Sequence, residues 1–398
     1  MAPLRFLQLS DVHFGQSMRG GQLRLPTDRA AQRVQERRDC FSRAINLVTG
    51  RDLDGVLIAG DLFDQESIDT DTLRFVIDRL GQIAPRPVFI APGNHDPWAG
   101  ASAYARQDAQ NVRGLNWPDN VHIFAHDEFQ TVSWPGREDV SVTGCGVAFD
   151  RPSDERRLGA RVARGSQIHS LLLFHGSRDD SGFLQADKST YPFSSSELLA
   201  QDFSWVALGH YHTRQIIPDS SGRPRAAYSG CLTASGLDET GSAGVLVVAI
   251  EEGRTSVEPT RLDPRTVRDI ECNLTGAAFT EAAQERLERA LKDCSKEDLV
   301  RVRLTGRRAS GLDLAWLDRF GGDRFHMVVD SSALRPDLDL ENWPSEDEAR
   351  TLEERFVARL KGIGQDGQDG TDEAQARRAM LYGLDALQRT RLDLRYED

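Results

Sequence analysis

The sequence contains few lysines and no long hydrophobic run. Four of its 398 residues are lysine, against 45 arginines. Its longest apolar stretch, about residues 244–250, is far shorter than the ~18 residues that a membrane-spanning helix needs. The N-terminus does not combine a basic start, a long apolar segment and a small-residue cleavage site, as a secretory signal would. We therefore expect a soluble, cytoplasmic protein that does not associate with membranes.

Cysteine and lysine usage excludes several kinds of site. The five cysteines are widely spaced and never form a C-x-x-C pair, which argues against a disulfide framework, a zinc ribbon and a thioredoxin-type site. We expect them to be core or surface thiols. None of the lysines follows a glycine, so the phosphate-binding loop G-x-x-x-x-G-K-[ST] is absent. Any dependence on ATP must come from another chain.

The surplus of acidic residues bears on the choice of partner. The formal net charge is -13, from 49 basic and 62 acidic residues, whereas proteins that grip nucleic acid through its phosphates usually have a basic surplus. Residues 337–398 hold 16 acidic and nine basic side chains, while residues 265–336 hold 12 acidic and 13 basic ones. The charge therefore argues less against a nucleic-acid substrate than against nucleic-acid binding by this chain alone.

One basic cluster stands where a predicted strand leads into a turn. Its members are Arg301, Arg303, Arg307 and Arg308. Because alternate residues of a strand share a face, Arg301 and Arg303 would project from the same side. We hypothesise that these two arginines face the phosphates of a nucleic acid, although a solvated strand edge explains the same pattern equally well.

The chain length predicts two or three domains. Up to about residue 264, short apolar runs at Leu4–Leu9, Gly55–Ala59 and Val88–Ala91 alternate with helical patterns at 32–48 and 71–80, which predicts a layered α/β domain. Further strands are expected at 140–147, 170–174, 205–208, 225–228 and 243–249. Several of them follow one another so closely that we expect antiparallel pairs in the second half of this domain.

Two further segments follow Pro264. Residues 265–335 predict a compact β-α-β-α-β module, with strands at 268–274, 299–304 and 325–329 and helices at 281–292 and 312–320. Residues 336–398 predict helices at 346–360 and 372–389, joined by a flexible glycine-rich linker at 362–371. On the last helix, Met380, Leu384 and Leu387 form a stripe that suits either core packing or docking. We expect domains at 1–264, 265–335 and 336–398.

Residues that bind metals in proteins follow the predicted strands in five places. They are Asp11 with His13, Asp61 with Asp64, Asn94 with His95, His175 alone, and His210 with His212. Because open α/β sheets gather their sites at the carboxyl ends of the strands, these five loops should meet in one pocket. We expect the neighbouring Asp96 to stabilise its loop as a hydrogen-bond acceptor rather than to bind metal.

The chemistry of this set favours a pair of metal ions. Three carboxylates, one amide and five imidazoles form a mixed oxygen and nitrogen set, which suits Mn, Fe, Co or Zn better than Ca or Mg. The donors are too many for one ion. Two ions roughly 3.5–4 Å apart, sharing a carboxylate, would clamp both oxygens of a phosphoryl displacement. They would also lower the pKa of a bound water towards ~7.

In their order, the motifs D-x-H, G-D-x-x-D, G-N-H-D, H and G-H-x-H resemble the calcineurin-like metallophosphoesterase superfamily. The resemblance implies an α/β fold, a four-layer β-sandwich flanked by helices, with a small α+β capping domain and C-terminal helices. It implies a first metal held by Asp11, His13, Asp61 and His212, and a second held by Asp61, Asn94, His175 and His210. His95 would protonate the leaving oxygen or stabilise charge, and Asp64 would orient His95.

The residues around the motifs resemble the SbcD-type DNA-repair exonuclease subunits, and among these the bacterial YhaO branch. The similar segments are 9–15, 59–64, 174–177, 207–212, 228–230 and 239–241. This resemblance implies a nuclease that uses two divalent ions, most often Mn²⁺, a capping domain that helps select DNA, an SbcC-type coiled-coil ATPase partner and a homodimer. Two alternatives to a nuclease remain open.

The first is a small-molecule phosphodiesterase or nucleotidase, which would use the same metals. The second is a non-catalytic scaffold, which should have lost metal ligands, and none is missing.

Overall fold

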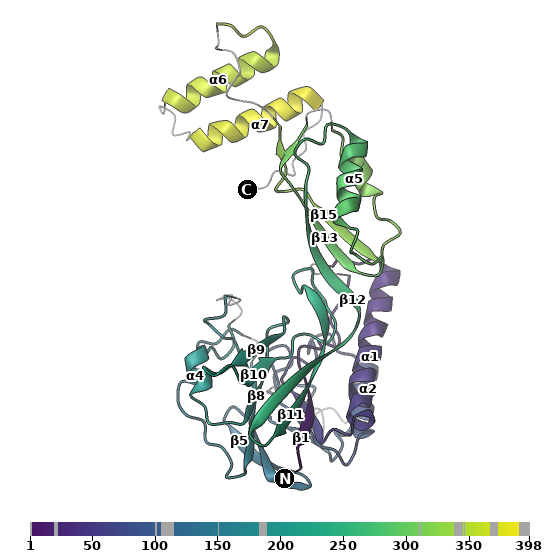
Figure 1. Ribbon diagram of the computed structural model, residues 1–398, viewed down its shortest axis with the longest axis vertical. Helices are drawn as coiled ribbons and strands as arrows, with labels where there is room; N and C mark the ends of the chain where they lie inside the picture. The colour runs from purple at the N-terminus through teal and green to yellow at the C-terminus, as the bar shows by residue number, and fades with distance from the viewer. Residues whose placement is uncertain are drawn as a thin grey trace. The chain divides into compact units, whose positions relative to one another are not determined.

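The protein divides into two compact units. The computed structural model describes residues 2–19, 23–99, 102–104, 115–149, 151–182, 189–309, 312–337, 345, 347–366 and 373–389 (Figure 1). Unit 1 comprises Met1–Thr266 and unit 2 comprises Val267–Asp398. The long strand β12 (Arg254–Asn273) contributes residues to both units. No helix in the described part of the chain is long and apolar enough to cross a membrane.

The first sheet of unit 1 is built around parallel strands. Its strands are β1 (Leu4–Leu9), β2 (Gly55–Ile58), β3 (Val88–Ile90), β4 (Val121–Ile123) and β11 (Gly241–Glu251). They lie in the order β11-β1-β2-β3-β4, with β1 to β4 parallel and β11 antiparallel to β1. Helix α1 (Thr27–Gly50) connects β1 to β2, and α2 (Thr70–Gly81) connects β2 to β3. The predicted alternation of strands and helices is confirmed here.

The second sheet has a parallel centre and antiparallel edges. Its strands are β5 (Gln130–Trp134), β6 (Arg137–Gly144), β7 (His169–His175), β8 (Trp205–Gly209), β9 (Gln215–Pro218) and β10 (Pro224–Tyr228). Strands β6, β7, β8 and β10 run parallel, and the edge strands β5 and β9 pair antiparallel with β6 and β10. The expected antiparallel pairs therefore occur, but only outside the central strands.

The two sheets pack face to face inside unit 1. Along β1, Leu4 and Phe6 join the core between the sheets, while Leu7 and Leu9 join the core under the helices, as the alternation of a strand requires. Helix α1 packs on β1, with α2 beside it (Figure 1). On the outer face of the second sheet, a third core includes Leu198 of the short helix α4 (Ser195–Leu199). Helices, two sheets and an outer layer make the predicted mixed α/β fold.

The described residues of unit 2 add three parallel strands to the first sheet. Strand β13 (Leu299–Thr305) lies between the end of β12 and β15 (His326–Asp330), and all three are parallel. Helix α5 (Thr280–Ala290) and the 3-10 helix η2 (Ala315–Asp318) pack on this sheet through Leu287 and Leu317. The short strands β14 (Arg307–Arg308) and β16 (Arg335–Pro336) pair with each other. The helix predicted at 312–320 is therefore shorter than expected.

The last two helices of unit 2 pack against each other. Helix α6 (Leu352–Asp366) extends into the segment predicted as a linker, and α7 is Glu373–Arg389. Residues 367–371, the rest of that predicted linker, lie outside the described residues. Met380 and Leu384 are buried against Val357 of α6. These two members of the predicted stripe therefore serve core packing.

Candidate metal centre

The ends of parallel strands from both sheets bring the predicted residues together. Strands β1, β2 and β3 supply three of the five motifs, and β7 and β8 supply the other two. Two glycines allow the close approach of these loops. A Cβ atom on Gly93 would lie 2.2 Å from Asp61 Oδ1, and one on Gly209 would lie 1.8 Å from the carbonyl oxygen of Ala59. Any larger residue at either position would push the strand ends apart.

Several of these residues have left-handed backbone conformations. The φ angles are 52° at Asp11, 51° at His13, 50° at Asp61 and 112° at His210. Such conformations cost of order 1–3 kcal/mol for a residue with a side chain and are concentrated at functional sites. Hydrogen bonds from main-chain amides hold these conformations in place. The amide of His13 donates to the Asp61 carbonyl at 3.0 Å, and that of His210 donates to Asp11 Oδ1 at 3.1 Å.

The first group of donors is Asp11, His13 and His212, with one ligand atom from each within 4.8 Å of the others. The Nε2 atoms of the two imidazoles are 3.1 Å apart. Their Nδ1 atoms face carboxylates, that of His13 at 3.1 Å from Asp64 and that of His212 at 2.5 Å from Glu239. If Nδ1 carries the proton in each ring, two lone pairs face each other, and a shared proton or a metal ion between them would remove the repulsion.

The second group surrounds Asp61. Its Oδ2 lies 3.5 Å from His175 Nε2 and 3.7 Å from His13 Nε2, so the carboxylate stands between the two groups. Although burial alone would raise the pKa of Asp61, the imidazoles of His175 and His13 hold that pKa below its usual range. This is the position that a bridging ligand would occupy.

Asn94 and His210 complete the second group. Asn94 Oδ1 lies 3.0 Å from His175 Nε2 and 3.2 Å from His210 Nδ1. The other nitrogen of His175, Nδ1, is 2.8 Å from the Ala59 carbonyl, which fixes the ring proton there and leaves Nε2 as an acceptor. Burial and the neighbouring His175 lower the pKa of His210 to about 3, so its ring is neutral. Two acceptors, Oδ1 and Nε2, thus face each other as they would around a cation.

His95 differs from these donors in its exposure. Half of its side-chain surface (51%) is exposed, and its Nδ1 lies 3.0 Å from Asp64 Oδ1. The hydrogen bond with Asp64 raises the pKa of His95 to about 9 against the effect of partial burial. The predicted partnership with Asp64 is present in the structure, and Asp64 also contacts His13 Nδ1. One carboxylate therefore orients two imidazoles.

Asp96 stabilises the loop that carries Asn94 and His95. Its buried carboxylate accepts hydrogen bonds from the amides of Asp61, Leu62, Phe63 and Gly93 and from the hydroxyl of Tyr104. These bonds tie the loop after β3 to the loop after β2. The prediction that Asp96 is a loop-stabilising acceptor is confirmed.

Glu239 is a functional candidate that has no role among the sequence-based predictions. Its carboxylate lies 2.5 Å from His212 Nδ1 and accepts from the amide of Ser235 at 2.6 Å. Burial opposes ionisation, but His212 lowers the pKa of Glu239 to about 2. Glu239 is 27 residues from His212 in the sequence, in a loop without metal-ligand spacing. Only the resemblance of 239–241 to SbcD-type proteins singled it out.

Removing the charge of Glu239 should weaken metal binding. We expect Glu239→Gln to lower the affinity for Mn²⁺ about 10–100-fold, because a carboxylate behind a ligating imidazole fixes the ring and raises its basicity. Isothermal titration of metal-stripped protein with MnCl₂ measures this. Glu258→Gln is a matched control, since that carboxylate is exposed and pairs with Arg51. Equal affinities of Glu239→Gln and the wild type would contradict the expectation.

The arginines predicted to face DNA lie in unit 2 on one face of β13, as expected for alternate positions. Arg301 and Arg303 both contact Asp269 of β12, at 2.7 and 3.0 Å. Their hydrogen bonds lower the pKa of Asp269, which is therefore ionised at neutral pH. Much of the positive charge at this strand face is thus matched by a neighbouring carboxylate.

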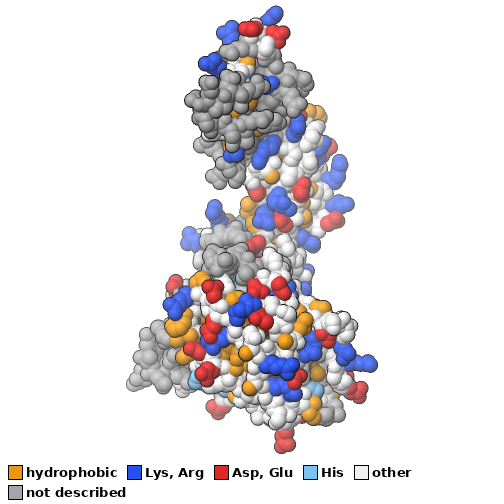
Figure 2. Space-filling view, turned by 90° about the vertical axis from the view of Figure 1, so that its left-hand side faces the viewer, with side chains coloured by type: hydrophobic (Ala, Val, Ile, Leu, Met, Phe, Trp, Pro, Cys, Tyr) orange, Lys and Arg blue, Asp and Glu red, His pale blue; other side chains and the backbone are white. Residues whose placement is uncertain are grey.

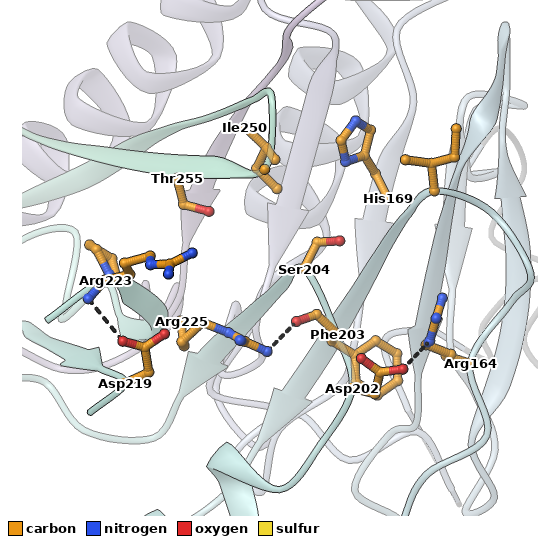
Figure 3. Close-up of a pocket in the computed structure, with 13 residues that line it drawn as sticks. Arg164, His169, Asp202, Phe203, Ser204, Asp219, Arg223, Arg225, Ile250 and Thr255 are labelled. Carbon is orange, nitrogen blue, oxygen red and sulfur yellow. Dashed lines mark hydrogen bonds and ion pairs between the residues drawn. The ribbon is translucent and has the colours of Figure 1, made fainter. Parts of the chain in front are cut away.

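A separate pocket of about 310 Å³ lies at the opposite end of the second sheet (Figure 3). It is lined by residues at the starts of β7, β8 and β10, among them His169, Ser204 and Arg225. Arg225 donates to the Phe203 carbonyl at 2.9 Å, and Arg164 pairs with Asp202 at 3.0 Å. Both arginines already have partners. The candidate metal donors lie at the opposite ends of these strands, so this pocket is distinct from the candidate metal centre.

Comparison with known proteins agrees with the geometry. The calcineurin-like phosphoesterase family matches residues 4–214. The chain is 26% identical to the uncharacterized metallophosphoesterase YhaO of Bacillus subtilis, over 65% of this chain and 60% of that protein. It is 25% identical to the DNA double-strand break repair protein Mre11 of Thermoplasma acidophilum, over 69% and 72% of the two chains.

A third relative is the SbcD component of the nuclease SbcCD from Bacillus subtilis, with 24% identity over 63% of this chain and 67% of that one. The family match covers more than half of this chain and includes all five strand ends that carry the donors. The chain therefore belongs to the calcineurin-like phosphoesterase family, which implies a metal-dependent hydrolase of phosphate esters.

Proposed function

We propose that the protein is a two-metal phosphodiesterase that hydrolyses DNA, as the nuclease subunit of an SbcCD-like repair complex. The observation that supports this most is the set of ligand atoms that face each other. His13 with His212, and His175 with Asn94, place ligand atoms 3.1 and 3.0 Å apart on either side of the Asp61 carboxylate. Oxygen and nitrogen donors in this arrangement fit two divalent ions of the Mn, Fe, Co or Zn type.

In this proposal each ion would have four protein ligands, with Asp61 common to both sets. Asp11, His13, Asp61 and His212 would hold the first ion, and Asp61, Asn94, His175 and His210 the second. Bound Mn²⁺ would activate water and neutralise charge on the phosphate. The chain itself supplies the orientation of the ligands: Asp64, Glu239 and the Ala59 carbonyl each face the Nδ1 atom of one ligand imidazole.

His95, oriented by Asp64, would supply the proton for the leaving group. The Nδ1 atom of His95 faces Asp64, so a proton on Nε2 is directed away from that carboxylate. With a pKa of about 9, the ring is protonated at neutral pH. It would donate this proton to the leaving oxygen or stabilise the charge of the transition state, as a general acid does.

Replacing Asp64 by asparagine should change the pH dependence. The group acts in its protonated form, so activity is present below the pKa of His95 and falls as the pH rises through about 9. Without the carboxylate this pKa should fall towards about 6.5, and the alkaline limb of the kcat profile should move to lower pH. Asp71→Asn, at an exposed position on α2, is the control. An unchanged limb in Asp64→Asn would contradict the pairing.

DNA as the substrate is supported by the relatives, whose names include a nuclease subunit and a double-strand break repair protein. The surface shows no strong basic patch on the face drawn in Figure 2, where blue and red side chains are interspersed over the described residues. We propose that residues 265–335 form a capping domain that contacts DNA through Arg301 and Arg303. The acidic segment 336–398, with α6 and α7, would bind an SbcC-like ATPase, and the active form would be a homodimer.

A direct test compares two phosphodiester substrates. Purified protein with MnCl₂ should degrade linear duplex DNA, at a higher rate with a coiled-coil ATPase partner, and should also hydrolyse bis(p-nitrophenyl) phosphate. Asp61→Asn should lose both activities. Robust turnover of the small ester without DNA cleavage, even with the partner, would overturn the nuclease proposal in favour of a small-molecule phosphodiesterase. Absence of both activities in a protein that binds Mn²⁺ would favour a scaffold.

A further inference from the structure

Arg37 is a fully buried cation directly behind the metal centre. Its side chain is 2% exposed, on the face of α1 that packs on the first sheet. Burial and the nearby Arg33 lower the pKa of Arg37 to about 10. No carboxylate in the described part of the chain forms an ion pair with it. The carboxylates of Glu239 and Asp64 attract its charge without pairing with it directly. A buried charge without a direct ion pair is costly, so the position calls for a role beyond packing.

The guanidinium joins two segments that are distant in sequence. One Nη atom donates to the carbonyl oxygen of His13. The other donates to Ser235 Oγ at 2.8 Å, and Nε donates to Thr233 Oγ1 at 3.2 Å. The first contact is in the loop after β1 and the other two are in the loop that ends in Glu239. One rigid fork therefore contacts both loops.

These two loops place the two imidazoles of the first metal group. The bond to the His13 carbonyl fixes the peptide of a residue that has a left-handed φ of 51°. The loop from Thr233 to Glu239 positions His212, because Glu239 accepts from the Ser235 amide at 2.6 Å and faces His212 Nδ1 at 2.5 Å. Arg37 thus acts on both rings whose Nε2 atoms are 3.1 Å apart.

A second arginine, one helical turn earlier, secures the same loop. Arg33 donates to the Ala234 carbonyl at 2.9 Å and pairs with Asp263, whose carboxylate accepts from the Ala234 amide at 2.9 Å. Arg33 has a counter-ion, so its charge is accounted for by a buried salt bridge. Arg37 has only neutral acceptors, and these all belong to the loops around the metal centre or lead into them.

We infer that Arg37 is a positioning residue that fixes the separation of His13 and His212, and so tunes the affinity of the first metal site. The inference rests on the proposed function in one respect, the assignment of these histidines as metal ligands. A planar guanidinium with several donors in fixed directions suits the task, because a lysine ammonium could not reproduce the fork. The effect should therefore depend on geometry as well as on charge.

The test measures Mn²⁺ binding and not activity. Full-length, metal-stripped protein is titrated with MnCl₂ by calorimetry, and thermal unfolding is recorded in parallel. The wild type should bind two ions. Arg37→Met should weaken one of the two sites about 10–100-fold, the usual effect of removing a residue that orients a ligand. Arg37→Lys should also weaken Mn²⁺ binding at that site, although the lysine keeps the positive charge.

A control and a second variant keep the test decisive. Arg43→Met is the matched control, since Arg43 lies on the same helix and donates to the Leu262 carbonyl at 2.7 Å, away from the metal donors. Thr233→Val with Ser235→Ala removes the loop acceptors while Arg37 keeps its bond to His13, and should also weaken one site if Arg37→Met fails to fold. Wild-type Mn²⁺ affinity in the Arg37 and loop variants, or an equal loss in Arg43→Met, would overturn the inference. Failure of the wild type to bind Mn²⁺ would instead overturn the proposed function.

Discussion

Replacing Asp61 by asparagine should abolish phosphodiester hydrolysis and reduce the number of tightly bound Mn²⁺ ions. Asp61 Oδ2 lies between His13 Nε2 at 3.7 Å and His175 Nε2 at 3.5 Å. An amide keeps the shape but loses the charge that two cations would share. The loss of several kcal/mol of transition-state stabilisation lowers the rate by about 10³-fold or more.

Two measurements check this expectation. Hydrolysis of bis(p-nitrophenyl) phosphate under saturating MnCl₂ gives the rate, and calorimetric titration gives the number of ions. Asp202→Asn makes the same chemical change at an exposed residue of the pocket at the far end of the second sheet, and should leave both unchanged. Two bound ions and a rate within tenfold of the wild type in Asp61→Asn would show that this carboxylate does not bridge.

Replacing His95 by alanine should separate catalysis from metal binding. Loss of a positioned general acid lowers kcat about 10²–10⁴-fold. The side chain is half exposed and its only described side-chain hydrogen bond is to Asp64, so the stability should change little. The number of bound Mn²⁺ ions should stay at two.

The alternative for His95 is also testable, because His95, Asp64 and His13 lie close enough to form a metal-binding group of their own. If His95→Ala loses one ion, His95 is a ligand rather than an acid. His126→Ala, at a histidine outside the centre, serves as the control for both rate and ion number. Phosphodiesters with better leaving groups should lose less rate in His95→Ala, because they need less protonation.

Much of the fold and of the donor set could be predicted because short-range patterns determine them. Strands β1, β2 and β3 are compact apolar runs that lead directly into the loops with the metal donors, and their positions match the prediction within one residue. Strand β12 begins at Arg254, whereas the sequence predicts a strand only from residue 268. Pro259 and Pro264 lack the amide that a ladder needs, so this segment does not look like a strand. The short edge strands β4, β5 and β9 have too few apolar residues to stand out.

The residues that hold the candidate metal donors in place could not be predicted, because their roles depend on contacts between residues that are distant in the sequence. Arg33 and Arg37 occupy buried positions on α1 where the periodicity of an amphipathic helix predicts apolar side chains. Both donate to the loop around Ala234, which lies about 200 residues away in the sequence. Likewise, the contact of Asp64 with His13, in addition to His95, requires the loops after β1 and β2 to be placed first.

The two close-approach glycines have a consequence for the evolution of such proteins. A methyl group on Gly93 or Gly209 would collide with Asp61 or with the chain before it, so a single alanine there should disable the centre without altering any donor. Loss of activity in a lineage could therefore pass unnoticed by anyone who compares metal ligands only. Whether a homologue has become a scaffold should be judged from these two positions as well as from its histidines and aspartates.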